Sequence, residues 1–287
     1  MILEKYELIN LLYKIINDMN FILKKRYGQN FLMSREFAKK FVDVAEIKNN
    51  DTIIEIGTGL GMITQYLLDT SEKVISIEID SRFINMLENR FKNEMQKGKL
   101  VIINQDFLKL NLKSFNLNKY KVIGSLPYNI SKRIIKILLE YDIKPKDMTF
   151  IIQNEVALDY TKKAPKATFL SNYAKIFSDV KLFSIIPKTE FKPMPKVDGA
   201  IIKFIIKESK INIDKPEFVQ FLKTSFINPR KKLLNNLSKI YKIGKDKIIE
   251  IFNEINIDKN SRAANLEFEQ WINLYKRFNL LPKDNNI

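Results

Sequence analysis

Short apolar runs alternate with helical segments between residues 51 and 152, and this alternation limits the possible folds more than any other feature of the chain. The expected strands cover residues 51–56, 73–79, 99–103, 120–123 and 148–152. The expected helices between them cover residues 62–68, 81–95 and 131–140. Strands that alternate with helices of about 10–15 residues form βαβ units with parallel strands. The sequence therefore predicts an α/β fold with a doubly wound, Rossmann-like sheet.

The pattern changes towards the end of the chain. Expected strands at 180–186 and 197–206 have no long helix between them, which favours an antiparallel pair at one edge of the sheet. Only helices are expected after that, at about 215–240, 245–256 and 266–279. We therefore expect three parts: an N-terminal extension (1–26), an α/β domain (27–207) and a smaller all-α domain (208–287).

The N-terminal extension has apolar residues at helix-like spacing, interrupted by charged residues such as Glu4, Lys5 and Asp18. No run approaches the roughly 20 apolar residues of a membrane span, and the pattern of a secretory signal is missing. We expect an amphipathic helix that packs on the rest of the protein or docks a partner, and no association with membranes.

The 287-residue chain contains neither Cys nor His. Their absence excludes disulfides, Cys/His zinc sites, Cys nucleophiles, Ser-His-Asp triads and imidazole acid/base catalysis. Any chemistry must use carboxylates, amides, hydroxyls, aromatic faces and backbone groups, and we expect no metal site. A chain without disulfides also fits a reducing compartment, so we expect a cytoplasmic protein.

The chain is strongly basic, with 49 Lys and Arg against 33 Asp and Glu, a net charge of +16. Residues 181–287 carry 21 basic and 12 acidic residues, so their net charge of +9 is more than half of this excess. Such a charge favours a polyanionic partner, nucleic acid ahead of a membrane surface. An ordinary Lys-rich surface is the alternative that charge alone leaves open.

A glycine-rich loop, Glu55-Ile-Gly57-Thr-Gly59-Leu-Gly61, follows the first expected strand and opens the first expected helix. Glycines allow a ligand to approach the backbone closely, and the start of the helix offers free N–H groups. The spacing is G-x-G-x-G and not the G-x-G-x-x-G of dinucleotide sites, which disfavours NAD.

One acidic residue closes the next expected strand along the chain, and another follows the strand after it. Glu78 is placed to accept hydrogen bonds from both hydroxyls of a ribose, and Asp106 from the amine of an adenine. Either acid alone would be an ordinary strand-end cap. Open α/β sheets bind ligands at the carboxyl ends of their strands, where the glycine loop and both acids are expected to meet. Together they indicate an adenosine ligand, with S-adenosylmethionine as the best candidate.

The fourth expected strand leads into Gly124-Ser125-Leu126-Pro127-Tyr128-Asn129. Pro127 fixes the backbone, and the ring of Tyr128 can stack on a planar base. Ser125 and a backbone carbonyl can accept hydrogen bonds from an exocyclic amine and so direct the nitrogen lone pair at a sulfonium methyl group. On its own this segment would be interpreted as a strand-to-helix turn with a packing tyrosine. Because it follows the glycine loop and both acids along the chain, it indicates an amino-methyltransferase.

These motifs resemble the KsgA/Dim family of rRNA adenine dimethyltransferases, whose relatives include the Erm resistance methylases. The resemblance runs from residue 27 to about 278. Its markers are the segments 27–32 (YGQNFL), 55–61 (EIGTGLG), 78–80 (EID), 105–106 (QD), 126–131 (LPYNIS), 153–157 (QNEVA) and 191–198 (FKPMPKVD). The segments 230–237 (RKKLLNNL) and 262–266 (RAANL) are similar to the family's C-terminal helical domain, and they favour the KsgA branch over Erm.

The resemblance implies a class I S-adenosylmethionine-dependent methyltransferase domain followed by a helical rRNA-binding domain. It implies that the cofactor is bound by Asn30, Leu32, Gly57, Gly59, Glu78, Asp106 and Ser125. Asn30 and Leu32 would close over the cofactor, and Gly57 would lie against its methionine part. It further implies that the catalytic segment is Ser125, Leu126, Pro127 and Tyr128, with the Tyr128 ring stacked on the target adenine.

The chain departs from the family pattern at two places. The usual residue at position 125 is Asn, whereas this sequence has Ser, whose oxygen also accepts a hydrogen bond but lies nearer the backbone. The second departure is the segment 166–171 (KATFLS).

The implied activity is dimethylation of N6 on two adjacent adenosines in the 3′-terminal hairpin loop of small-subunit rRNA, by a monomer that acts in small-subunit biogenesis. The candidate phosphate contacts are Lys192, Lys196, Arg230, Lys231 and Lys232. One alternative is an Erm-type methylase of large-subunit rRNA. The other is a ribosome-assembly or transcription factor that keeps the fold but has lost most of its catalysis, for which the two departures are the only support.

Overall fold

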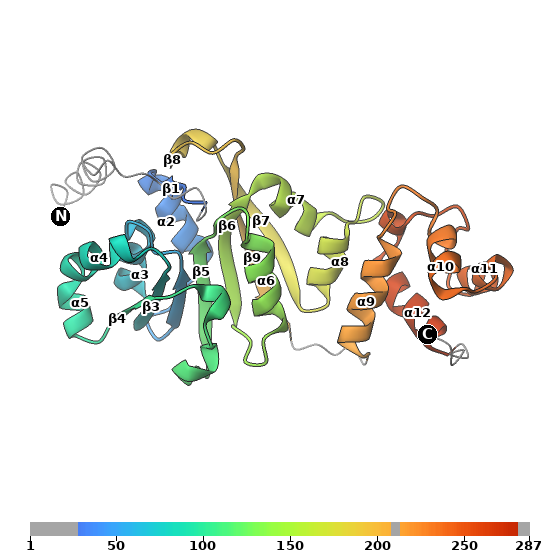
Figure 1. The fold of residues 1–287 in the computed structure, drawn as a ribbon, viewed down its shortest axis with the longest axis horizontal. Helices are drawn as coiled ribbons and strands as arrows, with labels where there is room; N and C mark the ends of the chain where they lie inside the picture. The colour runs from blue at the N-terminus through green and yellow to red at the C-terminus, as the bar shows by residue number, and fades with distance from the viewer. Residues whose placement is uncertain (1–27, 208–212, 281–287) are drawn as a thin grey trace. The chain divides into compact units, whose positions relative to one another are not determined.

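The structure is a computed structural model that describes residues 28–207 and 213–280 (Figure 1). The helix expected in the N-terminal extension lies outside the described residues. Among the described residues the chain forms two compact units, one of residues 28–157 and 181–206, the other of residues 158–180 and those from 207 onward.

The first unit is built on a seven-stranded sheet with the order β4-β3-β2-β5-β6-β9-β7. The strands are β2 (Thr52–Ile56), β3 (Lys73–Glu78), β4 (Leu100–Asn104), β5 (Tyr120–Ser125), β6 (Asp147–Gln153), β7 (Ser178–Ile186) and β9 (Gly199–Ile206). The first five are parallel, as the sequence predicts, and β9 runs antiparallel to β6. The two late strands are neighbours at one edge, although β9 begins at Gly199 and not at residue 197.

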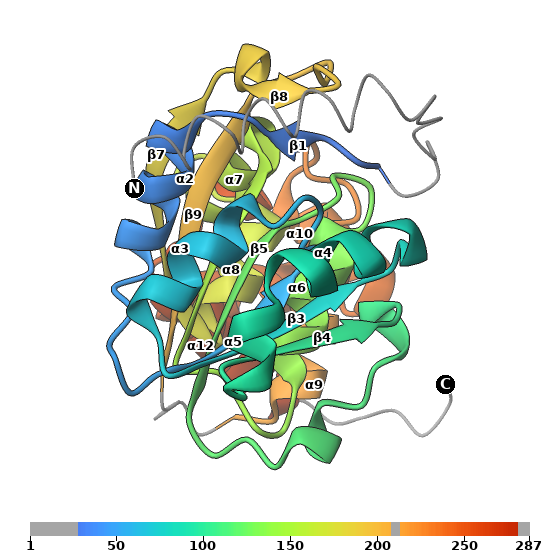
Figure 2. The ribbon, with the colours of Figure 1, turned by 90° about the vertical axis from the view of Figure 1, so that its left-hand side faces the viewer.

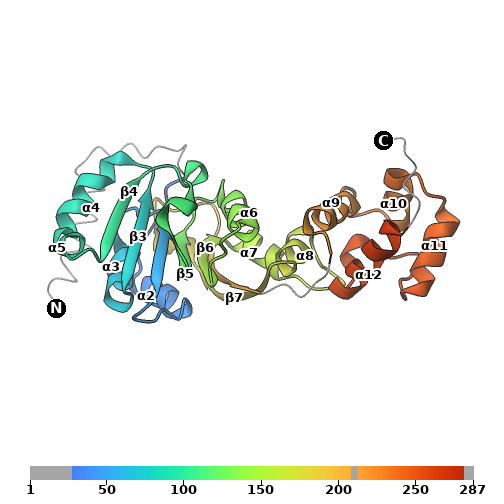
Figure 3. The ribbon, with the colours of Figure 1, turned by 90° about the horizontal axis from the view of Figure 1, so that it is seen from below.

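Helices cover both faces of this sheet (Figures 2 and 3). They are α2 (Arg35–Val44), α3 (Met62–Thr70), α4 (Ile84–Arg90), α5 (Lys92–Gln96), α6 (Ser131–Glu140) and α7 (Asn154–Thr161). Central strand residues such as Ile53, Val122 and Ile151 are fully buried, as expected for parallel strands covered on both faces. These short apolar runs therefore form the buried centre of the sheet.

The helix expected at 81–95 is interrupted in the structure. A 3₁₀ turn at Ser81–Phe83 precedes α4, and α4 is separated from α5 by Phe91, whose backbone is not helical. The Phe91 side chain is buried in the core of the sheet unit, so tertiary packing overrides the helical pattern here.

A second, very small sheet pairs β1 (Phe31–Leu32) with β8 (Phe191–Lys192). Leu32 lies opposite Phe191, and Met33 N donates a hydrogen bond to Glu190 O at 2.8 Å. This pairing ties the segment after residue 27 to a segment about 160 residues later. Two-residue strands leave no alternating pattern in the sequence, so the pairing was not predicted.

The second unit consists of α8 (Phe169–Lys175), α9 (Lys215–Ser225), α10 (Leu233–Tyr241), α11 (Lys245–Glu254) and α12 (Phe268–Asn279). The sequence pattern places residues 158–180 in the α/β domain, whereas packing groups them with these helices. The reason is that α8 packs on α9, and that Ala167 N donates to Ala264 O at 3.1 Å.

The single helix expected at 215–240 is wrong, because the chain leaves the helix at Phe226 and starts a new one at Leu233. Pro229 disfavours helical backbone at the residue before it. Lys232 then forms a β-bridge with Arg262, and Leu233 N donates to Ser261 O at 2.8 Å. None of the helices in the described part of the chain is long and apolar enough to cross a membrane.

Candidate cofactor and catalytic site

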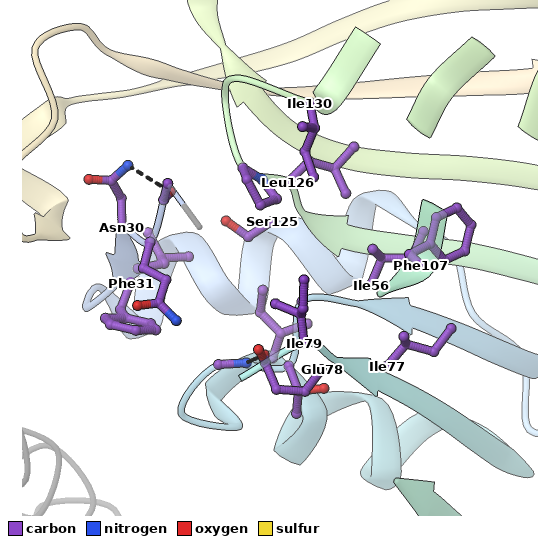
Figure 4. Close-up of a pocket in the computed structure, with 18 of the residues that line it drawn as sticks. Asn30, Phe31, Ile56, Ile77, Glu78, Ile79, Phe107, Ser125, Leu126 and Ile130 are labelled. Carbon is purple, nitrogen blue, oxygen red and sulfur yellow. Dashed lines mark hydrogen bonds between the residues drawn. The ribbon is translucent and has the colours of Figure 1, made fainter. Parts of the chain in front are cut away.

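A pocket opens at the carboxyl ends of the parallel strands in the first unit (Figure 4). It encloses about 1030 Å³ of empty space, part of which is open to solvent. Its walls come from segments that are far apart in the sequence: 28–32, the glycine loop, 77–79, 105–107 and 125–128. All seven predicted cofactor residues and all four predicted catalytic residues line it.

The glycine loop connects β2 to α3 and forms one wall. Gly57 has φ of +80°, which disfavours any residue with a Cβ, and a Cβ there would lie 3.3 Å from Ser125 O. Gly57 N donates to Ile77 O at 2.9 Å, which continues the β2–β3 ladder into the loop. The loop backbone is therefore fixed close to the predicted catalytic segment, with no Gly57 side chain between them.

Glu78 ends β3 and is 4% exposed. Its two carboxylate oxygens each accept a backbone hydrogen bond, Oε2 from Gly59 N and Oε1 from Asp80 N, both at 2.8 Å. Burial raises the pKa of Glu78, and these backbone donors oppose the shift. A carboxylate accepts up to about four hydrogen bonds, so this one can still accept ribose hydroxyls.

Behind the loop lies a buried polar network centred on Glu55. Its Oε2 accepts hydrogen bonds from Thr64 Oγ1 at 2.8 Å and from Ser76 Oγ, and Ser76 also shares a 2.7 Å hydrogen bond with Thr58 Oγ1. Burial raises the pKa of Glu55 to about 7, despite the opposing hydrogen bonds from Ser76 and Thr64. Because Thr58 lies within the glycine loop and Thr64 in the first turn of α3, the network ties the loop to β2 and β3.

Asp106 follows β4, and its Oδ1 accepts a hydrogen bond from Leu108 N at 2.9 Å. That bond caps the 3₁₀ turn Phe107–Lys109 and fixes the carboxylate at the pocket wall. Apolar side chains that include Ile79, Phe107 and Ile130 line the same pocket (Figure 4). A carboxylate among flat apolar surfaces is a suitable environment for an adenine ring.

The predicted catalytic segment begins at Ser125, the last residue of β5. A Cβ on Gly124 would lie 2.5 Å from Ile56 O, so β2 and β5 approach closely just before Ser125. Figure 4 shows the Ser125 hydroxyl directed into the pocket, on the side of Asn30. Leu126 is buried, and its N donates to Ile151 O at 3.0 Å, which anchors the segment to β6.

Pro127 O accepts hydrogen bonds from Ile130 N at 3.1 Å and Ser131 N at 3.0 Å, so the segment turns directly into α6. The Tyr128 hydroxyl is buried and has no hydrogen-bond partner among the described residues. It lies beside Gly199, where an added Cβ would be 3.2 Å away. Burial and the charge of Asp198 raise the pKa of Tyr128 to about 12, so the phenol stays neutral.

The pocket is also lined by residues that the sequence motifs do not assign to the cofactor. Gln29, Phe31 and Phe191 line the pocket, and Phe31 packs edge-on against Phe83 at 5.6 Å between ring centroids. The first two belong to the 27–32 motif, which therefore contributes more side chains than Asn30 and Leu32. The described residues contain no cluster of acidic side chains that could hold a metal ion.

The candidate phosphate contacts lie in two different units. Lys192 is half-buried in β8 and Lys196 is exposed in the following loop, both in the first unit. Arg230, Lys231 and Lys232 are exposed between α9 and α10 in the second unit. Lys232 Nζ also donates to Asn260 Oδ1 at 2.6 Å.

Two solved structures have a similar fold. A dimethyladenosine transferase from Plasmodium falciparum has a TM-score of 0.72 at 26% identity, and the match covers 86% of this chain and 96% of that chain. The 23S rRNA methyltransferase ErmE also has a TM-score of 0.72, at 22% identity, with 87% and 100% covered.

Comparison of sequences identifies the family more specifically than the similarity of fold does. The ribosomal RNA small subunit methyltransferase A of Mycoplasmopsis pulmonis is 37% identical over 255 residues, 88% of this chain and 97% of that protein. The protein of the same name from Ureaplasma urealyticum serovar 10 is 34% identical over 282 residues, 94% of this chain and 96% of that protein. A family model described as ribosomal RNA adenine dimethylase matches residues 20–280. The resemblance inferred from the motifs is confirmed: the chain belongs to the ribosomal RNA adenine dimethylase family, and it is a methyltransferase with a Rossmann-like α/β fold.

Proposed function

We propose that this protein uses S-adenosylmethionine to dimethylate N6 of two adjacent adenosines in the 3′-terminal hairpin loop of small-subunit rRNA. One observation carries the proposal: the glycine loop, Glu78, Asp106 and the segment Ser125–Tyr128 surround a single pocket. In this pocket they can contact the methionine part, the ribose and the adenine of the cofactor, with the target base beside them. The small-subunit specificity is supported by the names of the relatives at 34–37% identity.

The residues present fit the cofactor. The buried Glu78 carboxylate suits the ribose, Asp106 suits the adenine, and the Gly57 backbone leaves room for the methionine part, which Asn30 and Leu32 would close over. When bound, S-adenosylmethionine supplies an electrophilic methyl group on a sulfonium. The protein's own task is to hold the target amine in line with that group and to exclude water.

Ser125 Oγ and the backbone carbonyl of the Leu126–Pro127 region would accept hydrogen bonds from the adenine amine. The Tyr128 ring would stack on the base after it leaves the RNA, and stacking of about 1–3 kcal/mol offsets part of the cost of extracting it. Methyl transfer leaves the nitrogen as a positively charged ammonium, which is a strong acid and loses its proton to water. No tuned general base is therefore required, in agreement with a chain that lacks His and Cys.

The basic residues Lys192, Lys196, Arg230, Lys231 and Lys232 would contact rRNA phosphates. Four of them are exposed, and the net charge of +16 supports binding to a polyanion. We infer that the protein acts as a monomer in the cytoplasm during small-subunit biogenesis. The fold similarity to ErmE gives no preference for large-subunit RNA, because at 22% identity it reflects the fold alone.

The test is incubation of the purified protein with methyl-labelled S-adenosylmethionine and small ribosomal subunits that lack the modification, with large-subunit RNA in parallel. We expect label in dimethyladenosine of the small-subunit RNA only. Label confined to large-subunit RNA would move the protein to the resistance branch of the family. Tight binding to small subunits without any label would favour a protein that assembles ribosomes but no longer catalyses methylation.

The Ser125→Asn substitution distinguishes an enzyme adapted to serine at this position from a family member that has lost most of its catalysis. In an adapted enzyme the hydroxyl already holds the adenine amine, so Ser125→Asn changes the methylation rate by less than about threefold, within about 0.7 kcal/mol of barrier. In a decayed enzyme the same substitution restores a missing acceptor and raises the rate by at least tenfold. We expect the first result.

A further inference from the structure

Asp80 is 1% exposed and charged, and it stands directly behind the cofactor pocket without lining it. Its carboxylate is held by the Arg82 guanidinium, with Nε 2.9 Å from Oδ1 and Nη2 2.5 Å from Oδ2. Gln29 Nε2 donates a further hydrogen bond to Oδ2 at 2.9 Å. Burial raises the pKa of Asp80, but the hydrogen bonds from Arg82 and Gln29 outweigh burial and bring it to about 2. Asp80 is therefore ionised at every working pH.

An ionised carboxylate can only accept hydrogen bonds, so the end of the Gln29 amide that faces Asp80 must be its NH₂ group. The carbonyl oxygen, Oε1, is then turned away from Asp80. This oxygen is buried and has no hydrogen-bond partner among the described residues, while Gln29 itself lines the cofactor pocket. A buried carbonyl without a partner is unfavourable, and a ligand that donates to it removes that penalty.

Asp80 also reaches the pocket through its backbone, since its N–H donates to Glu78 Oε1 at 2.8 Å. One residue thus orients two pocket groups, the Glu78 carboxylate and the Gln29 amide. These two groups come from segments 49 residues apart in the sequence, and Asp80 is bonded to both.

We propose that Asp80 is a positioning residue of the cofactor site, which holds Gln29 so that its carbonyl oxygen accepts a hydrogen bond from a hydroxyl or ammonium group of the cofactor. The identity of the cofactor rests on the proposed function. The orientation of the Gln29 amide rests only on the contacts described above.

The test measures the affinity for S-adenosylhomocysteine by calorimetry in four proteins: wild type, Gln29→Ala, Asp80→Asn and the double variant. Asp80→Asn keeps the backbone N–H to Glu78 but removes the charge that fixes the amide. We expect each single substitution to weaken binding about tenfold or more, as for the loss of a hydrogen bond within a charged network. We expect the double variant to bind no more weakly than Gln29→Ala, because Asp80 acts through Gln29.

Asp80→Asn removes the negative charge that pairs with Arg82 and lowers stability, so thermal unfolding is followed in parallel. If the Asp80→Asn protein unfolds, the Gln29→Ala protein still tests the proposal. The matched control is Asp142→Asn, which makes the same chemical change in the exposed ion pair with Lys113 and outside the pocket. It should leave the affinity unchanged. Strictly additive losses in the double variant, or unchanged affinity in Gln29→Ala, would overturn the proposal.

Repeating the titration with 5′-methylthioadenosine, which lacks the amino-acid part, identifies the donor. If Gln29→Ala weakens only S-adenosylhomocysteine, the donor is the ammonium group; if it weakens both ligands, the donor is a ribose hydroxyl. A wild-type protein that binds neither ligand contradicts the proposed function together with this inference. Wild-type binding that Gln29→Ala leaves intact contradicts this inference alone.

Discussion

The carboxylate of Glu78 accepts a hydrogen bond from the backbone N–H of Gly59 at 2.8 Å, so the acid at the end of β3 is fixed to the loop at the end of β2. The bond joins the two features by which the sequence predicted an adenosine ligand. Both residues line the same pocket, so a change at Glu78 affects both the proposed ribose contact and the loop.

Glu78→Gln should weaken binding of S-adenosylhomocysteine at least tenfold and Glu78→Ala more, because hydrogen bonds to charged groups contribute about 1.5–3 kcal/mol. Titration calorimetry measures both. Since burial raises the pKa of Glu78, wild-type binding should weaken on acidification at a higher pH than the ordinary glutamate value of 4.5 implies. The Glu78→Gln protein should lack this pH dependence; if it keeps it, Glu78 is not the titrating group.

Gly61 and Gly98 form a matched pair for the packing of the glycine loop. Both have a left-handed backbone, with φ of +75° and +70°, but a Cβ on Gly61 would lie 2.8 Å from Phe91 and 2.9 Å from Leu87, whereas Gly98 has open space. Gly98→Ala should lower the free energy of unfolding by about 1–2 kcal/mol through backbone strain alone. Gly61→Ala should lower it by about 1–3 kcal/mol more, through overpacking. Equal losses in urea denaturation would contradict the close packing of Leu87 and Phe91 against this loop.

Glu55 should make the protein less stable as the pH rises. Burial raises its pKa to about 7 in the folded state, against the ordinary value of 4.5, so between these values the folded protein binds more protons than the unfolded chain. The free energy of unfolding therefore falls as the pH rises from about 5 to above 7, by on the order of 3 kcal/mol at most. Glu55→Gln cannot titrate and should flatten this slope, which urea denaturation at a series of pH values measures. An unchanged slope would assign the titration to another group.

Tyr128→Ala should lower kcat/KM for the RNA substrate about 10- to 100-fold, in line with stacking of about 1–3 kcal/mol, while the affinity for S-adenosylhomocysteine stays within twofold. Tyr128→Phe keeps the ring and should retain most of the activity. It should not reduce stability, because the buried hydroxyl has no hydrogen-bond partner among the described residues. A Phe variant as impaired as the Ala variant would show that the hydroxyl, and not stacking, matters.

The parallel sheet and the core of the site could be predicted because their signals are local. Buried parallel strands are apolar runs, and the groups at their carboxyl ends, such as Glu78 and Ser125, follow those runs directly in the sequence. The shared edge of the sheet then brings them into one pocket without further information. This is why all predicted cofactor and catalytic residues line it.

The parts that escaped prediction depend on contacts between distant residues. The hydrogen bond from Gln29 to Asp80 spans 51 positions, and the pairing of Leu32 with Phe191 joins strands of two residues each. The break between α9 and α10 is fixed by the bridge from Lys232 to Arg262 and not only by Pro229. None of these contacts leaves a periodic pattern, so only the folded chain reveals them.

Mass spectrometry of the treated RNA identifies the modified bases directly. Small subunits that lack the modification are incubated with the protein and S-adenosylmethionine, and the fragment with the 3′-terminal hairpin loop is isolated and sequenced by its fragment masses. We expect two methyl groups on each of two adjacent adenosines in that loop, and none in large-subunit RNA treated in the same way. An unmodified loop, or methylation confined to large-subunit RNA, would contradict it.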